Sequence, residues 1–203
     1  MLTDLPNLLT LSRIGAVPLV VALVALRLPG ADLAASLVFG VAAVTDWLDG
    51  HLARSRRQAS DLGRMLDPIA DKLLVGAALM VLAGEGRLAG GALFPAIVIL
   101  LREILVSGLR EYLAGIRVGL PVTRLAKWKT GVQLLAVGLL LAGDAGARVI
   151  GLGAIRPLVL GTGLLWIAAA LTLLTGWDYL TAGVRHASRK AAPPSGGVEK
   201  TPG

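Results

Sequence analysis

Four aspartates stand close together in a chain made mostly of Leu, Ala, Val and Gly. They are Asp46, Asp49, Asp67 and Asp71, within the segment DWLDGHLARSRRQASDLGRMLDPIADK, residues 46–72. The first pair is three residues apart and the second four, so on helices each pair shares a face. Carboxylates at this density repel one another unless cations hold them. Oxygen ligands of this kind suit Mg²⁺ or Mn²⁺, and two such ions suit a displacement at phosphorus.

The residues between the aspartates fit a ligand that carries phosphate. Gly50 and Ala53 follow Asp46 at i+4 and i+7, so small side chains lie on the same helical face. Arg54 offers a forked donor for phosphate oxygens, and Gly63 allows two helices to approach closely. The segment therefore predicts a site for metal ions and a phosphorylated substrate.

Two helices in an antiparallel hairpin would position these side chains. The pair Asp46 and Asp71 and the pair Asp49 and Asp67 are both centred near residue 58. A hairpin that turns around residues 54–60 would therefore bring the four carboxylates to matching depths. An ionisable cluster within apolar helices is usually functional, because its burial is costly.

The composition is that of an all-α polytopic membrane protein. The 203 residues are 55% hydrophobic and 16% charged, with a mean hydropathy of +0.75. A helical span needs about 20 apolar residues. We predict six transmembrane helices at residues 8–28, 31–54, 61–84, 92–115, 122–143 and 154–184, with breaks at Leu28-Pro29-Gly30, Gly84-Glu85-Gly86 and Gly143-Asp144-Ala145-Gly146. Residues 1–186 would form the catalytic membrane domain, and residues 187–203 a disordered cytoplasmic tail.

Charge and cysteine content exclude several other classes of function. The net charge is +7, but aromatic residues make up only 4% and the basic residues lie between apolar runs, so no nucleic-acid partner is expected. Membrane topology and anionic ligands explain the positive charge better. The absence of Cys excludes disulfides, thiol catalysis and zinc–thiolate sites.

The distribution of basic residues predicts the orientation. Thirteen lie on one side, against four on the other, where we find Arg27, Arg87, Arg148 and Arg156. The side with more Lys and Arg faces the cytoplasm. Both termini and the four aspartates are therefore expected at the cytoplasmic side.

The aspartate segment resembles the signature of the CDP-alcohol phosphatidyltransferase family, D-x2-D-G-x2-A-R-x8-G-x3-D-x3-D. Its eight fixed positions span 26 residues and are Asp46, Asp49, Gly50, Ala53, Arg54, Gly63, Asp67 and Asp71. The resemblance implies a six-helix fold, usually dimeric, in a bacterial cytoplasmic membrane with the active site facing the cytoplasm. It also implies transfer of a phosphatidyl group from CDP-diacylglycerol to an alcohol, with release of CMP. In that family the first three aspartates hold two divalent cations, and the fourth, Asp71 here, is also the catalytic base.

Looser similarity indicates the acceptor alcohol. The segments PNLLTLSRI (6–14), REILVSGLRE (102–111) and KWKTGVQL (127–134) are similar to the bacterial branch that uses sn-glycerol 3-phosphate. We predict that Arg110, Arg124 and Lys127 bind the acceptor phosphate.

Other polar residues have weaker assignments. Asn7, Thr10 and Arg13 share a face of the first span and could contact CDP-diacylglycerol or pack as polar helix residues. Lys129 could be no more than a membrane anchor, and Arg102 could merely neutralise Glu103.

Three alternatives stay open. The acceptor could be serine, inositol phosphate or phosphatidylglycerol. An intramembrane prenyltransferase also uses aspartates and metals, but it would have two separate motifs and more spans. A divalent-cation transporter would need acids near the bilayer midplane with access from both sides, whereas these acids lie toward one side.

Overall fold

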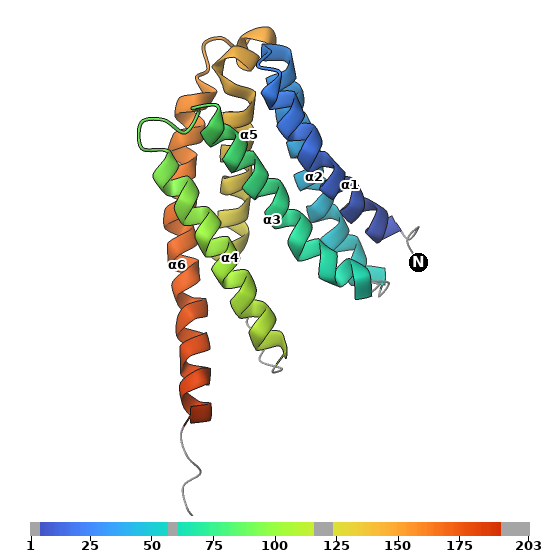
Figure 1. Ribbon diagram of the computed structural model, residues 1–203, viewed down its shortest axis with the longest axis vertical. Coiled ribbons are helices and arrows are strands. Elements are labelled where there is room, and N and C mark those ends of the chain that lie inside the picture. Colours follow the sequence, from blue (N-terminus) through green and yellow to red (C-terminus); the bar gives the residue numbers. More distant parts are fainter. Residues whose placement is uncertain (1–4, 57–60, 116–123, 192–203) are drawn as a thin grey trace, which may run out of the picture.

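The computed structural model describes residues 5–56, 61–115 and 124–191. The regular secondary structure in this part of the chain is all α-helix (Figure 1). Its six helices are α1 (Leu5–Ala25), α2 (Pro29–Arg56), α3 (Asp61–Gly84), α4 (Leu93–Gly115), α5 (Arg124–Val149) and α6 (Pro157–Ala191). Their order and bounds agree closely with the predicted spans. α6 continues to Ala191, into the segment predicted as a tail, and residues 192–203 lie outside the described residues.

The helices form two arms that diverge toward one end of the molecule. One arm consists of α1, α2 and α3, in which α1 packs against the other two helices. The second arm consists of α4 and α6, which pack against each other (Figure 1). α5 joins the arms, because it packs extensively against both α2 and α6, and Ser36 Oγ donates a 2.8 Å hydrogen bond to the Gly138 carbonyl. α3 and α4 make few contacts with each other, which leaves space between the arms.

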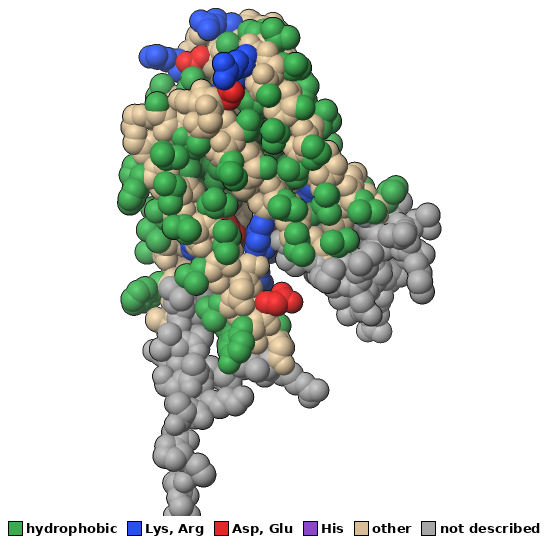
Figure 2. Space-filling model, in the orientation of Figure 1, with side chains coloured by type: hydrophobic (Ala, Val, Ile, Leu, Met, Phe, Trp, Pro, Cys, Tyr) green, Lys and Arg blue, Asp and Glu red, His purple; other side chains and the backbone are tan. Residues whose placement is uncertain are grey.

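Apolar surfaces cover the sides of the arms. The buried core is built from apolar side chains such as Phe39, Leu82 and Ile99, yet many large apolar side chains are exposed. Figure 2 shows hydrophobic side chains over the flanks and charged ones at one end and in the hollow between the arms. Among the described helices, three segments are long and apolar enough to cross a bilayer: Leu8–Ala25, Leu125–Val149 and Pro157–Trp177. The structure therefore supports a helical membrane protein, and six crossings stay a prediction.

The break expected at residues 143–146 is a kink within α5. Gly143 has φ 60° and ψ 170°, a left-handed conformation that glycine tolerates, and the helix resumes to Val149. The kink frees backbone carbonyls, and Arg87 Nη1 donates to those of Leu140 and Leu141 at 3.3 and 2.7 Å. Asp144 Oδ1 accepts a 3.0 Å hydrogen bond from Leu158 N at the start of α6.

Two ion pairs stabilise the end of the bundle that lies opposite the signature segment. Arg87 Nη2 lies 2.6 Å from Asp32 Oδ1, and both side chains are largely buried. The Arg27–Glu85 pair, at 2.9 Å, is much more exposed. These pairs connect α2 and the segment after α1 to the α3–α4 connection, so they hold the arms where they converge.

Candidate active site

The family signature is carried by two consecutive helices, as predicted. α2 contains Asp46, Asp49, Gly50, Ala53 and Arg54, and α3 contains Gly63, Asp67 and Asp71. Of these side chains, only that of Asp71 belongs to the described part of the structure. The clustering of the four carboxylates therefore stays a prediction. Among the described side chains there is no group of three that could hold a metal ion.

Asp71 lies within electrostatic reach of charged groups on its own helix and on three others. Its half-buried carboxylate interacts electrostatically with Lys72 on α3, Glu103 on α4, Arg13 on α1 and Lys129 on α5. Three of these four charged groups are cations, so Asp71 faces a mainly positive environment. Such surroundings favour the binding of an anionic ligand beside Asp71.

A cavity of about 710 Å³ opens beside Asp71, mainly between α3 and α4. Val17 of α1 and Gln133 of α5 complete its lining. Most of the wall is apolar, and Gly76, Ala77 and Gly108 keep it wide. The polar lining residues are Asp71, Lys72, Glu103, Ser107, Glu111 and Gln133. An apolar cavity with a few converging polar groups is the usual form of a small-molecule site, and its size fits one.

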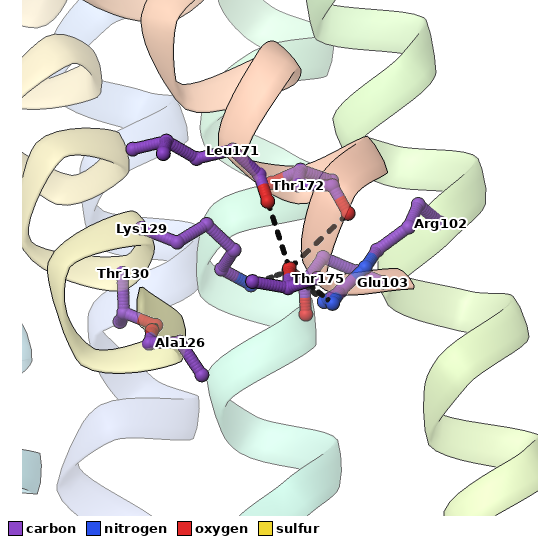
Figure 3. A network of polar contacts seen from close by, with 8 residues as sticks. All are labelled: Arg102, Glu103, Ala126, Lys129, Thr130, Leu171, Thr172 and Thr175. Atoms are coloured by element: carbon purple, nitrogen blue, oxygen red, sulfur yellow. Dashed lines mark hydrogen bonds and ion pairs between the residues drawn. The ribbon is translucent and has the colours of Figure 1, made fainter. Parts of the chain in front are cut away.

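One wall of the cavity is supported by a polar network between α4, α5 and α6 (Figure 3). Glu103 forms an ion pair with Lys129, whose side chain is almost fully buried, and its Oε1 lies 3.4 Å from Arg102 Nη1. Arg102 Nη2 donates a 2.7 Å hydrogen bond to Thr175 Oγ1. Gly176 makes room for this, since a Cβ there would lie 3.1 Å from Arg102 Nε. Glu103 is thus held by two cations, and Arg102 does more than neutralise it.

The structure describes two of the three side chains predicted to contact substrate from the first helix. Thr10 and Arg13 are 5% and 2% exposed, and Arg13 is near Asp71. Both side chains therefore point into the bundle and not toward lipid. The side chain of Asn7 lies outside the described residues.

Two of the three predicted acceptor residues are outside the lining of the cavity. Arg110 and Lys127 are exposed and do not line the cavity, and the side chain of Arg124 lies outside the described residues. The cavity-facing stripe of α4 includes Glu103, Ser107 and Glu111, so it advances in steps of four and leaves Arg110 at its edge. Our assignment of these cations to the acceptor phosphate stays a prediction.

Sequence reasoning left one residue of this site undecided and missed another. Lys129 was left open between a membrane anchor and a functional cation, and Gln133 had no assigned role, although both lie in the segment KWKTGVQL. They are four residues apart and therefore share a face of α5. A polar pair at this spacing in an otherwise apolar helix is the signal that could have identified them.

Comparison with known proteins decides the family. Residues 3–174 match the model of the CDP-alcohol phosphatidyltransferase family. The chain belongs to this family.

Several relatives share most of their length with this chain. A protein of Rickettsia bellii is 42% identical over 179 residues, covering 88% of this chain and 94% of the relative. A protein of Cereibacter sphaeroides is 39% identical over 220 residues, covering 94% and 96%. A protein of Arabidopsis thaliana is 37% identical over 180 residues, covering 83% and 75%. The first two are named CDP-diacylglycerol–glycerol-3-phosphate 3-phosphatidyltransferase, and the third has the same name with the number 2.

Proposed function

We propose that this protein transfers the phosphatidyl group of CDP-diacylglycerol to sn-glycerol 3-phosphate, giving phosphatidylglycerophosphate and CMP. The observation that carries the proposal is the position of Asp71. This last acid of the family signature opens onto a largely apolar cavity with converging polar groups. The relatives that share its length carry the name of this activity.

The donor set fits hard divalent cations, two Mg²⁺ or Mn²⁺ held by Asp46, Asp49, Asp67 and Asp71. When bound, these cations neutralise the diphosphate and stabilise CMP as the leaving group. Arg54, with Gly50, Ala53 and Gly63 making room, contacts the phosphates of CDP-diacylglycerol. Asn7, Thr10 and Arg13 approach the same substrate from α1, as the burial of the latter two supports.

Asp71 acts as the base of the transfer. Its carboxylate takes the proton of the primary hydroxyl of glycerol 3-phosphate, and the hydroxyl oxygen attacks the phosphorus that carries the diacylglycerol. The bond from this phosphorus to the bridging oxygen breaks as the new one forms, and CMP leaves. No covalent intermediate with the protein is formed. Arg110, Arg124 and Lys127 bind the acceptor phosphate at the mouth of the site.

The proposal includes a membrane setting. Both water-soluble partners, the acceptor and CMP, exchange with the cytoplasm, whereas the acyl chains stay in the bilayer. The protein is an integral protein of a bacterial cytoplasmic membrane, with its active site facing the cytoplasm. It forms a homodimer, as the family resemblance implies.

An acceptor screen tests this function. Purified protein is given radiolabelled CDP-diacylglycerol, Mg²⁺ and one acceptor at a time: glycerol 3-phosphate, serine, inositol phosphate or phosphatidylglycerol. We expect CMP release and a labelled lipid product with glycerol 3-phosphate alone. Efficient transfer to another alcohol would reassign the acceptor. Absence of CMP release with every alcohol would overturn the enzymatic function.

A further inference from the structure

Gln133 carries a polar group without a role in the fold. The residue lies on α5, is 4% exposed and lines the cavity that contains Asp71. Its Oε1 is buried and has no hydrogen-bond partner within the described part of the chain. A buried carbonyl without a partner is unfavourable, so its retention beside a cavity points to a ligand that donates a hydrogen bond.

The neighbours of Gln133 are already engaged. Lys129, one turn earlier on α5, is paired with Glu103, and Glu103 also contacts Arg102. Lys129 is nevertheless close enough to interact electrostatically with Asp71, so this face of α5 lies near the proposed base. The Oε1 of Gln133 is therefore a neutral acceptor without a partner in the described part of the chain, and it lies beside charged groups that are paired with one another.

The chemistry of an amide selects the part of the ligand that it binds. A phosphate or diphosphate is better held by cations, which the site offers elsewhere. A neutral carboxamide can accept a hydrogen bond from an alcohol and donate one back. The proposed acceptor has two hydroxyls on adjacent carbons: the primary one reacts, and the secondary one on C2 is left without a partner by Asp71.

We propose that Gln133 binds the C2 hydroxyl of the acceptor and thereby determines its selection, an inference that rests on the proposed function. With the reacting hydroxyl at Asp71 and the C2 hydroxyl at Gln133, the glycerol carbons are held at two points. This arrangement orients the primary oxygen toward phosphorus. It also disfavours alcohols that lack a hydroxyl at that position, because the buried amide then stays unpaired.

The test compares glycerol 3-phosphate with 3-hydroxypropyl phosphate, which keeps the phosphate and the primary hydroxyl but lacks the one on C2. With the wild-type protein, kcat/KM is expected to be about 10–100-fold lower for the analogue. Gln133→Met keeps the length of the side chain and removes its polar atoms. We expect it to lower kcat/KM for glycerol 3-phosphate by a similar factor and to change the analogue little, so that the discrimination disappears.

Two controls accompany this comparison. The KM for CDP-diacylglycerol and the thermal midpoint of Gln133→Met should stay near their wild-type values. Thr130→Val also removes a polar atom from α5, but Thr130 is exposed, does not line the cavity and bonds the Ala126 carbonyl at 3.1 Å. This variant should keep the full discrimination.

Each remaining outcome decides against the inference. If Gln133→Met retains the wild-type discrimination, another residue recognises the C2 hydroxyl. If the wild-type protein uses both acceptors equally well, the hydroxyl is not recognised, and this result holds even where the variant does not fold. If glycerol 3-phosphate itself is not used, the proposed function fails and the inference falls with it.

Discussion

Asp71 is proposed both as a metal ligand and as the catalytic base, and a substitution can separate these two roles. Asp71→Asn keeps an oxygen for a cation but cannot accept a proton, so Mg²⁺-dependent binding of CDP-diacylglycerol should persist. Turnover should fall about 10²–10⁴-fold, the usual contribution of a positioned base. Equilibrium binding and turnover measured on the same preparation provide the check.

Asp46→Asn is the matched comparison for that prediction. Asp46 is proposed as a ligand without a proton role, so its variant should lose nucleotide binding together with turnover. If Asp71→Asn loses binding as severely as Asp46→Asn, then Asp71 is only a ligand and the base lies elsewhere.

Among the helices, α5 has the central position because it packs against both arms. Its contact with α6 depends on Gly161, where an added Cβ would lie 2.8 Å from Leu140 Cγ and 3.0 Å from the Ala136 carbonyl. Gly161→Ala should therefore separate the helices and destabilise the protein by about 1–3 kcal/mol. Thermal unfolding in detergent measures this change.

Gly163 supplies the control on the same helix. A Cβ there meets no atom within 4 Å, and alanine is the better helix former. Gly163→Ala should leave the midpoint unchanged or raise it slightly. Equal losses in the two variants would mean that close packing at Gly161 is unimportant.

The buried ion pair between Arg87 and Asp32 leads to a second prediction about the stability of the helix packing. Arg87→Met leaves the Asp32 carboxylate buried without its cation and the kink carbonyls of α5 without their donor. A loss of about 3–5 kcal/mol is expected, again from thermal unfolding. Because this end lies far from Asp71, the kcat of the folded fraction should stay close to wild type.

Arg27→Met breaks a pair of the same kind in an exposed setting. The Arg27 side chain is 73% exposed, so solvent screens its attraction to Glu85 and the loss should be about 0–1 kcal/mol. A similar loss of stability in Arg87→Met and Arg27→Met would show that burial does not strengthen the Arg87–Asp32 pair.

For the whole molecule, the two arms converge at one end and diverge at the other. The diverging end is the one at which α2 ends and α3 begins (Figure 1). The proposed orientation places the diverging end at the cytoplasm. Because the chain contains no Cys, single cysteines can report on it directly. Ala89→Cys, in the α3–α4 connection, should react with an impermeant maleimide on intact spheroplasts.

Gly115→Cys, at the last residue of α4, should react only after the membrane is permeabilised. Both positions are exposed, so reactivity depends on the side of the membrane and not on burial. The reverse labelling pattern would invert the topology and place the active site outside the cytoplasm.

The sequence by itself determined the features that depend on local spacing. Apolar runs and Pro/Gly breaks located six helices, and the intervals between the aspartates placed the signature on two of them. Local intervals do not say which side of a helix meets a distant partner. Lys127 and Lys129 are two residues apart, and only the tertiary structure shows that Lys129 is the buried one, paired with Glu103 of α4.

Only the tertiary structure decided the composition of the cavity. Arg110 and Glu111 are neighbours in sequence, yet Glu111 lines the cavity and Arg110 does not, because the packing of α4 against α6 and α3 decides which stripe of α4 faces inward. Likewise, only the tertiary structure shows that the Leu141 carbonyl beside the kink at Gly143 accepts a hydrogen bond from Arg87, 54 residues earlier in the chain. The same non-local packing brings Gln133 to the cavity beside Asp71, because helix orientation is set by contacts between segments that are remote in sequence.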